Sequence, residues 1–159
     1  MNLELAYIID QLNETYSGSP WYGSNITQLL SAVDDSITSE RPNNQHSLLE
    51  LLWHVITWRE FTIAALNKSD AETIEQIRAK DWRELDQFDK TIWQQGLQRL
   101  QQTQDELLHI VQQQNDELLN QIAFRDFTFR TLLNGIIQHD IYHIGQVAYV
   151  TKFLRSKSD

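Results

Sequence analysis

Two histidines, His139 and His143, stand four residues apart in the segment QHDIYHIGQ. On an α-helix this spacing places both imidazoles on one face, one turn apart, so their nitrogens can point at the same spot. Helical metal sites use this H-x-x-x-H geometry. The residue after His139 is Asp140 rather than glutamate, so the segment does not match the H-E-x-x-H protease motif. The spacing therefore predicts part of a metal site, but not a protease centre.

The two histidines belong to a row with alternating three- and four-residue steps, which is typical of a buried face in a helical bundle. The row consists of Phe129, Leu132, Ile136, His139, His143, Gln146, Val150 and Phe153. Burying an imidazole without a partner costs on the order of 1–3 kcal/mol. Two such groups one turn apart need a common partner, which a metal ion can provide. The alternative is that each histidine is a hydrogen-bonded core residue.

A third histidine, His54, lies in a second row with the same spacing. That row consists of Leu51, His54, Trp58, Phe61 and Ala65. The other apolar rows offer only Gln104 as a polar candidate, so the expected metal ligands are His54, His139 and His143. Three histidines with a fourth position left for water form the catalytic type of site rather than the closed structural type.

Several neighbouring residues are candidates for supporting roles. Asp140 and Gln146 are expected either to hydrogen-bond a ligand imidazole or to bond a neighbouring helix. Trp58 is either a core residue or the wall of a substrate pocket. His46 and His109 are expected at the surface. The sequence assigns no general base and contains no cysteine that could act as a nucleophile.

Four long amphipathic segments must position these residues. Ser47 and Glu50 form a capping box, which marks the start of the helix that carries His54. The chain from residue 43 onward contains no proline, which favours long helices. Long helices are expected over residues 3–15, 47–66, 85–114 and 128–154, a short helix over 25–33, a helical turn near 71–78 and an extended segment over 124–129. This pattern predicts an all-α four-helix bundle with a short extra helix in the first connection.

Length and charge limit the function. A chain of 159 residues is expected to form a single domain, residues 1–159. Its 22 acidic and 13 basic residues give a net charge of −9, which repels nucleic acid and anionic membranes. No apolar run could span a bilayer, and the first residues do not resemble a signal peptide. We therefore expect a cytoplasmic protein that acts on a small molecule, with no nucleic-acid or membrane partner.

Three stretches, GSPWYGSNITQLL, RPNNQHSLLELLWHVITWRE and TFRTLLNGIIQHDIYHIGQVAYVTKFL, resemble the DinB-like superfamily of DinB/YfiT-like metalloenzymes. They lie near the start, the middle and the end of the chain, and residues 68–125 carry no family signature. The resemblance implies a four-helix bundle of the DinB-like type with an unusual helix order. It also implies a divalent metal ion held by three histidines, which fall on His54, His139 and His143.

The family includes S-transferases that use bacillithiol, an isomerase that uses mycothiol and proteins described as hydrolases. The resemblance therefore implies a divalent ion that activates a low-molecular-weight thiol or water for attack on a small electrophile, and three imidazoles suit Zn, Ni, Co or Fe. The resemblance also implies a homodimer as one expected form of this chain. A thiol S-transferase is the first expectation. A metal-dependent hydrolase, a non-catalytic metal-binding stress-response bundle, and a helical interaction module without metal are the alternatives.

Overall fold

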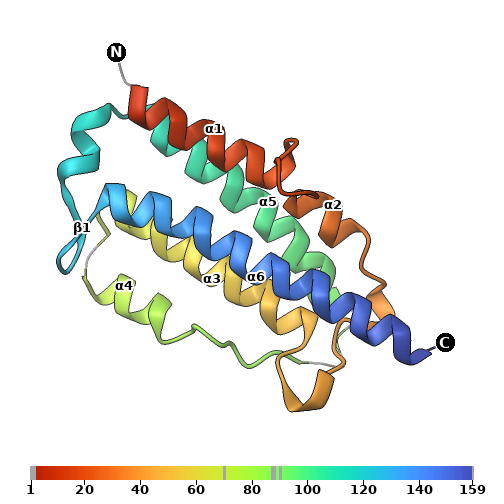
Figure 1. Cartoon of the computed structure of the whole chain (residues 1–159). Coiled ribbons are helices and arrows are strands. Elements are labelled where there is room, and N and C mark those ends of the chain that lie inside the picture. Colours follow the sequence, from red (N-terminus) through yellow and green to blue (C-terminus); the bar gives the residue numbers. More distant parts are fainter. Residues whose placement is uncertain (1–2, 70, 87–88, 90, 159) are drawn as a thin grey trace.

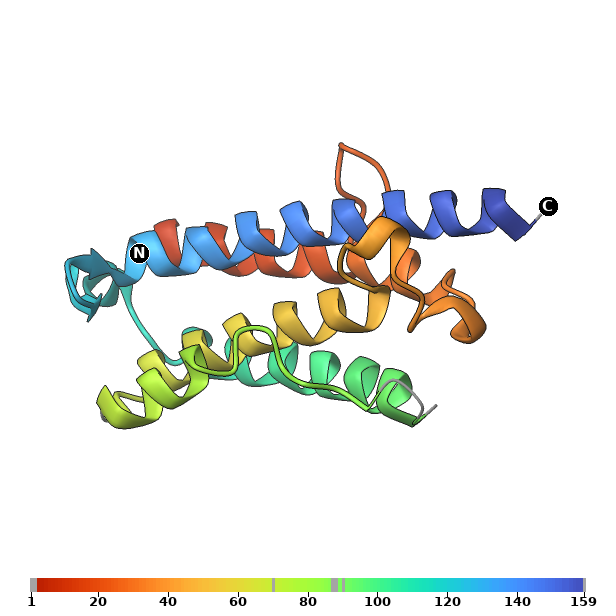
Figure 2. The same ribbon diagram turned by 90° about the horizontal axis from the view of Figure 1, so that it is seen from below.

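The computed structural model describes residues 3–69, 71–86, 89 and 91–158. Its four long helices are α1 (Leu3–Ser17), α3 (Leu48–Leu66), α5 (Thr91–Gln112) and α6 (Phe129–Ser158). They form two layers, with α1 beside α6 in one and α3 beside α5 in the other (Figures 1 and 2). The prediction of an all-α four-helix bundle is confirmed.

Helix direction explains how the chain is connected. Within each layer the two helices run the same way, and the two layers run in opposite directions (Figure 1). Parallel neighbours cannot be joined by a short turn, because the chain must return along the whole helix. The connection from α3 to α5 therefore runs back along α3, after the short helix α4 (Ala71–Arg78). This return segment carries residues 79–86 past the middle of α3.

The remaining connections contain only short elements. They are α2 (Ile26–Ser31), the 3₁₀ turns η1 (Asp35–Ile37), η2 (Pro42–Asn44) and η3 (Asp116–Asn120), and a hairpin of β1 (Ile122–Phe124) and β2 (Phe127–Thr128). The two strands pair in antiparallel fashion. The expected short early helix and the helical turn at residues 71–78 are present, whereas the segment expected to be extended over 124–129 is instead a hairpin that turns at Arg125 and Asp126 and ends where α6 begins.

Side-chain caps fix where the helices begin. Ser47 and Glu50 form the predicted capping box, with the Glu50 amide donating to Ser47 Oγ at 3.2 Å and the Ser47 amide donating to Glu50 Oε2 at 2.8 Å. Thr128 Oγ1 accepts from the amide of Thr131 at the start of α6, at 3.3 Å. These caps satisfy amides that have no partner within the first helical turn.

The expected start of α5 at residue 85 is wrong. Leu85 and Asp86 lie outside any helix, and α5 begins at Thr91. The Thr91 amide donates to Asp89 Oδ1 at 2.8 Å, so the Asp89 carboxylate stabilises the first turn of the helix there. Residues 87–88 and 90, which the predicted helix also included, lie outside the described residues.

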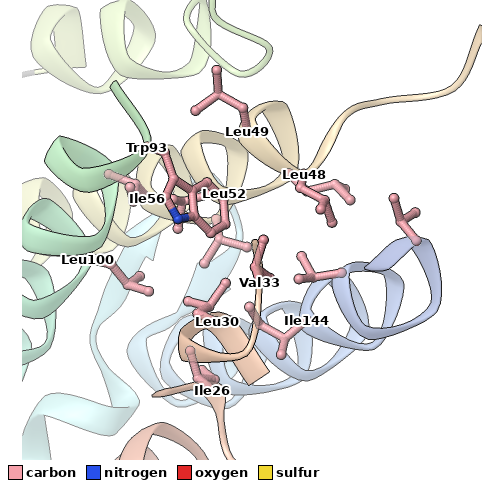
Figure 3. Packing of buried hydrophobic residues seen from close by; sticks show 14 of the residues in the cluster. Ile26, Leu30, Val33, Leu48, Leu49, Leu52, Ile56, Trp93, Leu100 and Ile144 are labelled. Carbon is pink, nitrogen blue, oxygen red and sulfur yellow. The ribbon is translucent and has the colours of Figure 1, made fainter. Parts of the chain in front are cut away.

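Two apolar clusters form most of the core. One joins α2, α3, α5 and α6, and Figure 3 shows Leu30, Leu52, Trp93 and Ile144 of this cluster pointing toward one another. The other joins α1, α3, α5 and the first half of α6, with Leu107 and Leu133 fully buried. Within the described part of the chain, no helix is long and apolar enough to cross a membrane.

The most buried row of residues on α6 is shifted by one position in the sequence from the predicted row. It consists of Leu133, Ile137, Asp140, Ile144, Val147, Thr151 and Leu154. In the predicted row, Leu132, His139, Gln146 and Phe153 are only partly buried. The two rows have the same spacing and lie about 100° apart around the helix, so periodicity alone does not distinguish them. His139 therefore lies at the edge of the core, where it lines a cavity, while His143 is buried.

Candidate metal centre

Three histidines from two adjacent helices converge at the middle of the bundle. His54 Nε2 of α3 lies 3.0 Å from His143 Nε2 and 3.1 Å from His139 Nε2, both of α6. One nitrogen from each residue lies within 4.8 Å of the other two. In a tetrahedral zinc site, bonds of about 2.0–2.1 Å hold ligand nitrogens about 3.3 Å apart. The structure thus brings together the three residues that the sequence pattern selected, at a spacing that could hold a metal ion.

Hydrogen bonds at the opposite ring nitrogens set the tautomers of two of these histidines. His54 Nδ1 donates to the backbone carbonyl oxygen of Asp81 at 3.3 Å, with Asp81 Oδ1 also 3.0 Å away, and His143 Nδ1 lies 2.9 Å from Gln146 Oε1. Because both partners are acceptors, each Nδ1 carries the hydrogen and each neutral ring presents an Nε2 lone pair. Two lone pairs then face each other at 3.0 Å. A cation between them converts this repulsion into attraction.

His139 is held differently. Its Nδ1 has no hydrogen-bond partner among the described residues, and Asp140 Oδ1, equally unpartnered there, lies 4.0 Å away. The other oxygen of Asp140 accepts from Arg59 Nε at 2.9 Å and forms an ion pair with Arg59 Nη2 at 2.8 Å, and both side chains are only 1% exposed. Arg59 Nη1 also donates to Gln104 Oε1, at 2.9 Å. Of the two residues expected to support an imidazole, Gln146 bonds His143, whereas Asp140 bonds mainly Arg59.

The return segment after α4 covers one side of the centre. Asp81 accepts a second hydrogen bond, from Trp58 Nε1 at 2.6 Å. The ring of Trp82 stacks on His54 with centroids 4.0 Å apart, and the ring of His46 stacks on Trp82 at 3.6 Å. Sequence analysis missed Asp81 and Trp82, since they lie in a polar connection without helical periodicity. The signal it could have used is an acidic residue next to a tryptophan in that connection.

The two other histidines lie outside the cluster. His46 is half-exposed and reaches the centre only through its stacking on Trp82. His109 is exposed and its Nε2 pairs with the side chain of Gln113 at 2.9 Å. Both were expected at the surface, and neither contributes a nitrogen to the cluster.

Burial keeps two of the converging imidazoles, those of His54 and His143, neutral. It lowers the pKa of His143 to about 4, and the nearby His139 acts in the same direction. Burial also lowers the pKa of His54 below its ordinary value, although the carboxylate of Asp81 opposes that shift. Both rings are therefore unprotonated at neutral pH. A cation would bind without first displacing a proton from either of them.

A cavity lies on each side of the histidines along α6. The first, of about 470 Å³, is lined by His46, Leu51, Gln146 and Val150 among others. The second, of about 380 Å³, is lined by Trp58, Ile136 and His139 among others. The side chain of His139 is 24% exposed, more than that of His54 at 6%. The second cavity therefore reaches a ligand of the candidate metal centre directly.

A sequence model of the DinB superfamily matches residues 23–147. The matched region covers most of the chain and contains His54, His139 and His143. No curated protein and no solved structure matches the chain. With more than half of its length matched by this one family, the chain belongs to the DinB superfamily.

Proposed function

We propose that this protein is a metal-dependent enzyme whose three histidines hold a divalent ion through their Nε2 atoms. The observation that carries the proposal is the convergence of His54, His139 and His143 with Asp81 and Gln146 bound behind two of the rings. A bound divalent ion supplies Lewis acidity, which lowers the pKa of a coordinated thiol or water. The proposed reaction is attack by such a group on a small electrophile.

The chain's own residues orient the site and leave one side of it open. Asp81 and Gln146 hold two imidazoles in the orientation that directs lone pairs at one point. Among the described residues, the ligand cluster contains only the three histidines. A structural site would be expected to close with a fourth protein ligand. The three-ligand arrangement therefore supports an enzyme over the non-catalytic alternative.

We propose a thiol, rather than water, as the nucleophile. Free thiols have a pKa of about 8.5, whereas that of water is about 15.7, so a thiol needs far less activation. Hydrolysis would also profit from a residue that accepts a proton from water. The two carboxylates nearest the histidines already have partners: Asp81 Oδ1 accepts from Trp58 Nε1, and Asp140 is bound to Arg59 in the core. Thiol S-transfer is the first proposal, and hydrolysis the second.

Metal content of purified variants tests the ligand set. His54→Ala, His139→Ala and His143→Ala should each lose most of the bound metal when measured by elemental analysis. His109→Ala is the matched control, because that residue is exposed and remote from the cluster. A variant of the three that keeps its full metal content would remove that residue from the site.

A transfer assay tests the reaction. The zinc-loaded wild-type protein should consume a small thiol together with an electrophile such as 1-chloro-2,4-dinitrobenzene, faster than the His143→Ala variant does. Release of product without thiol consumption would favour hydrolysis. No acceleration with any thiol or ester tested would favour the non-catalytic alternative.

A further inference from the structure

Two glycines inside α6 have no packing role. A Cβ placed on Gly135 or on Gly145 would meet no described atom within 4 Å outside the local helix backbone. Gly96 of α5 differs, because a Cβ there would lie 2.7 Å from Leu52 Cδ2, so the close approach of α3 explains it. Glycine is disfavoured inside a helix relative to alanine. Gly135 lines the 380 Å³ cavity and Gly145 the 470 Å³ cavity, so each leaves space in a cavity beside the histidines.

The cavity beside Gly135 has aromatic walls, and we call it the aromatic cavity. Its lining includes Trp58, Phe61, Phe124 and Phe127. The ring of Phe61 packs edge-on against Trp58 at 5.4 Å and against Phe124 at 5.2 Å between centroids. The volume of about 380 Å³ lies within the range of small-molecule sites. These walls favour an aryl or alkyl group of that size.

Two arginines line the same cavity. The guanidinium carbons of Arg78 and Arg125 lie 5.5 Å and 5.1 Å from the centroid of the Phe124 ring. Arg78 also pairs with Glu75 at 3.1 Å, where both side chains are substantially exposed. Arg125 stands at the tip of the β1–β2 hairpin with φ 51°, a left-handed conformation that costs free energy for a non-glycine residue. In a chain of net charge −9, these two cations make one apolar cavity attractive to an anion.

We infer that the aromatic cavity binds the electrophilic substrate, and that this substrate is an apolar organic anion. Its apolar part would lie against Trp58, Phe61 and Phe124, and its anionic group beside Arg78 and Arg125. His139 lines the same cavity, so a molecule bound there reaches the candidate metal centre. This inference rests on the proposed function, which names the reaction but not the class of electrophile.

Calorimetric titration of the zinc-loaded protein tests the inference with three probes, 4-phenylbutyrate, 4-phenylbutanol and acetate. The first has both features, the second lacks the charge, and the third lacks the apolar part. We expect 4-phenylbutyrate to bind about tenfold more tightly than either of the others, as a charge-assisted contact allows. Equal affinity for 4-phenylbutyrate and acetate would indicate binding at the metal alone and overturn the inference. Equal affinity for the acid and the alcohol would also overturn it.

Variants with matched controls locate the site. Gly135→Leu should abolish 4-phenylbutyrate binding by filling the aromatic cavity, whereas Gly145→Leu, on the same helix but in the other cavity, should leave it unchanged. Arg78→Gln and Arg125→Gln should each reduce the affinity for the acid but not for the alcohol. Lys157→Gln, which removes one exposed positive charge near the end of α6, should have no effect. Loss of binding in Gly145→Leu, or full affinity in both arginine variants, would contradict the assignment.

The two proposals can fail separately. Binding of 4-phenylbutyrate to the aromatic cavity in a protein without thiol-transfer activity would leave the assignment of the cavity to an apolar organic anion standing and remove thiol transfer from the proposed function. Thiol transfer by a protein that binds the acid and the alcohol equally would leave the proposed function standing and overturn this inference.

Discussion

Asp81 Oδ1 lies 3.0 Å from His54 Nδ1, so a residue of the return segment sets the orientation of an imidazole on α3. The same oxygen accepts from Trp58 Nε1 at 2.6 Å, which holds the carboxylate in place. This arrangement depends on the helix order, because only a parallel α3–α5 pair sends the connecting chain back across the middle of α3. The unusual topology of the bundle therefore provides part of the candidate metal centre.

Asp81→Asn should weaken zinc binding by about 10- to 100-fold, as substitutions behind a metal-bound histidine commonly do. The amide removes the negative charge that lies 3.0 Å from His54 Nδ1 and favours the metal-bound ring, while the backbone carbonyl of residue 81 still accepts the Nδ1 hydrogen. Competition with a chromophoric chelator measures the affinity. Glu84→Gln, an exposed acid in the same segment, is the control and should bind zinc as the wild type does. Wild-type affinity in Asp81→Asn would show that the contact does not support the metal.

Removing the metal should lower the melting temperature by several degrees without unfolding the protein. The two apolar clusters do not include the three histidines, so the core remains when the ion is removed. A ligand that binds only the folded state stabilises it by mass action. Circular dichroism melts with and without chelator provide the measurement. A random-coil spectrum for the chelated protein would mean that folding requires the ion.

The chelated protein should lose stability as the pH falls from about 6.5 to about 4. The unfolded chain has ordinary histidine pKa values, whereas burial lowers those of His54 and His143 in the folded state, the latter to about 4. In this window the unfolded state binds protons that the folded state does not, so acid favours unfolding. Well above pH 6.5 both states are neutral at these rings and the effect vanishes.

Urea midpoints measured across this pH range check the direction of the effect. The difference between wild type and His143→Ala isolates the histidine contribution, because the carboxylates titrate alike in both proteins. If the two curves ran parallel from pH 7 to pH 4.5, the His143 ring would not be the group responsible.

Arg59→Met should destabilise the protein by about 3–5 kcal/mol, because it leaves the Asp140 carboxylate buried without its partner. Replacing both residues, with Arg59→Met and Asp140→Leu together, should recover much of that loss, since no charge then remains buried. Urea unfolding measures both free energies. A double variant no more stable than Arg59→Met alone would show that the pair contributes by more than mutual neutralisation.

The three histidines could be selected from the sequence because regular helices carry them. Four-residue spacing brings His139 and His143 to one face, and His54 stands in an apolar row of similar depth. The most buried row of α6 was not recognised because it contains Asp140. A carboxylate is not expected in the core unless a partner for its charge is known. That partner, Arg59, is 81 residues away, and no local pattern reveals such a pairing.

The reason that Asp81 and Trp82 were not predicted is different. They lie in a connection without periodicity, and their positions follow from the course of the chain between α3 and α5. The start of α5 was missed because a single side chain, that of Asp89, caps the helix after a stretch that still reads as helical.

Cobalt substitution tests the central claim most directly. The Co²⁺-loaded protein should show the visible spectrum of a tetrahedral site, and a small thiol should add a thiolate-to-cobalt charge-transfer band as it enters the open position. The same titration of His143→Ala should give no such band. A wild-type spectrum unchanged by thiols and by small anions would mean a closed site, and would contradict an enzyme that activates its nucleophile on the ion.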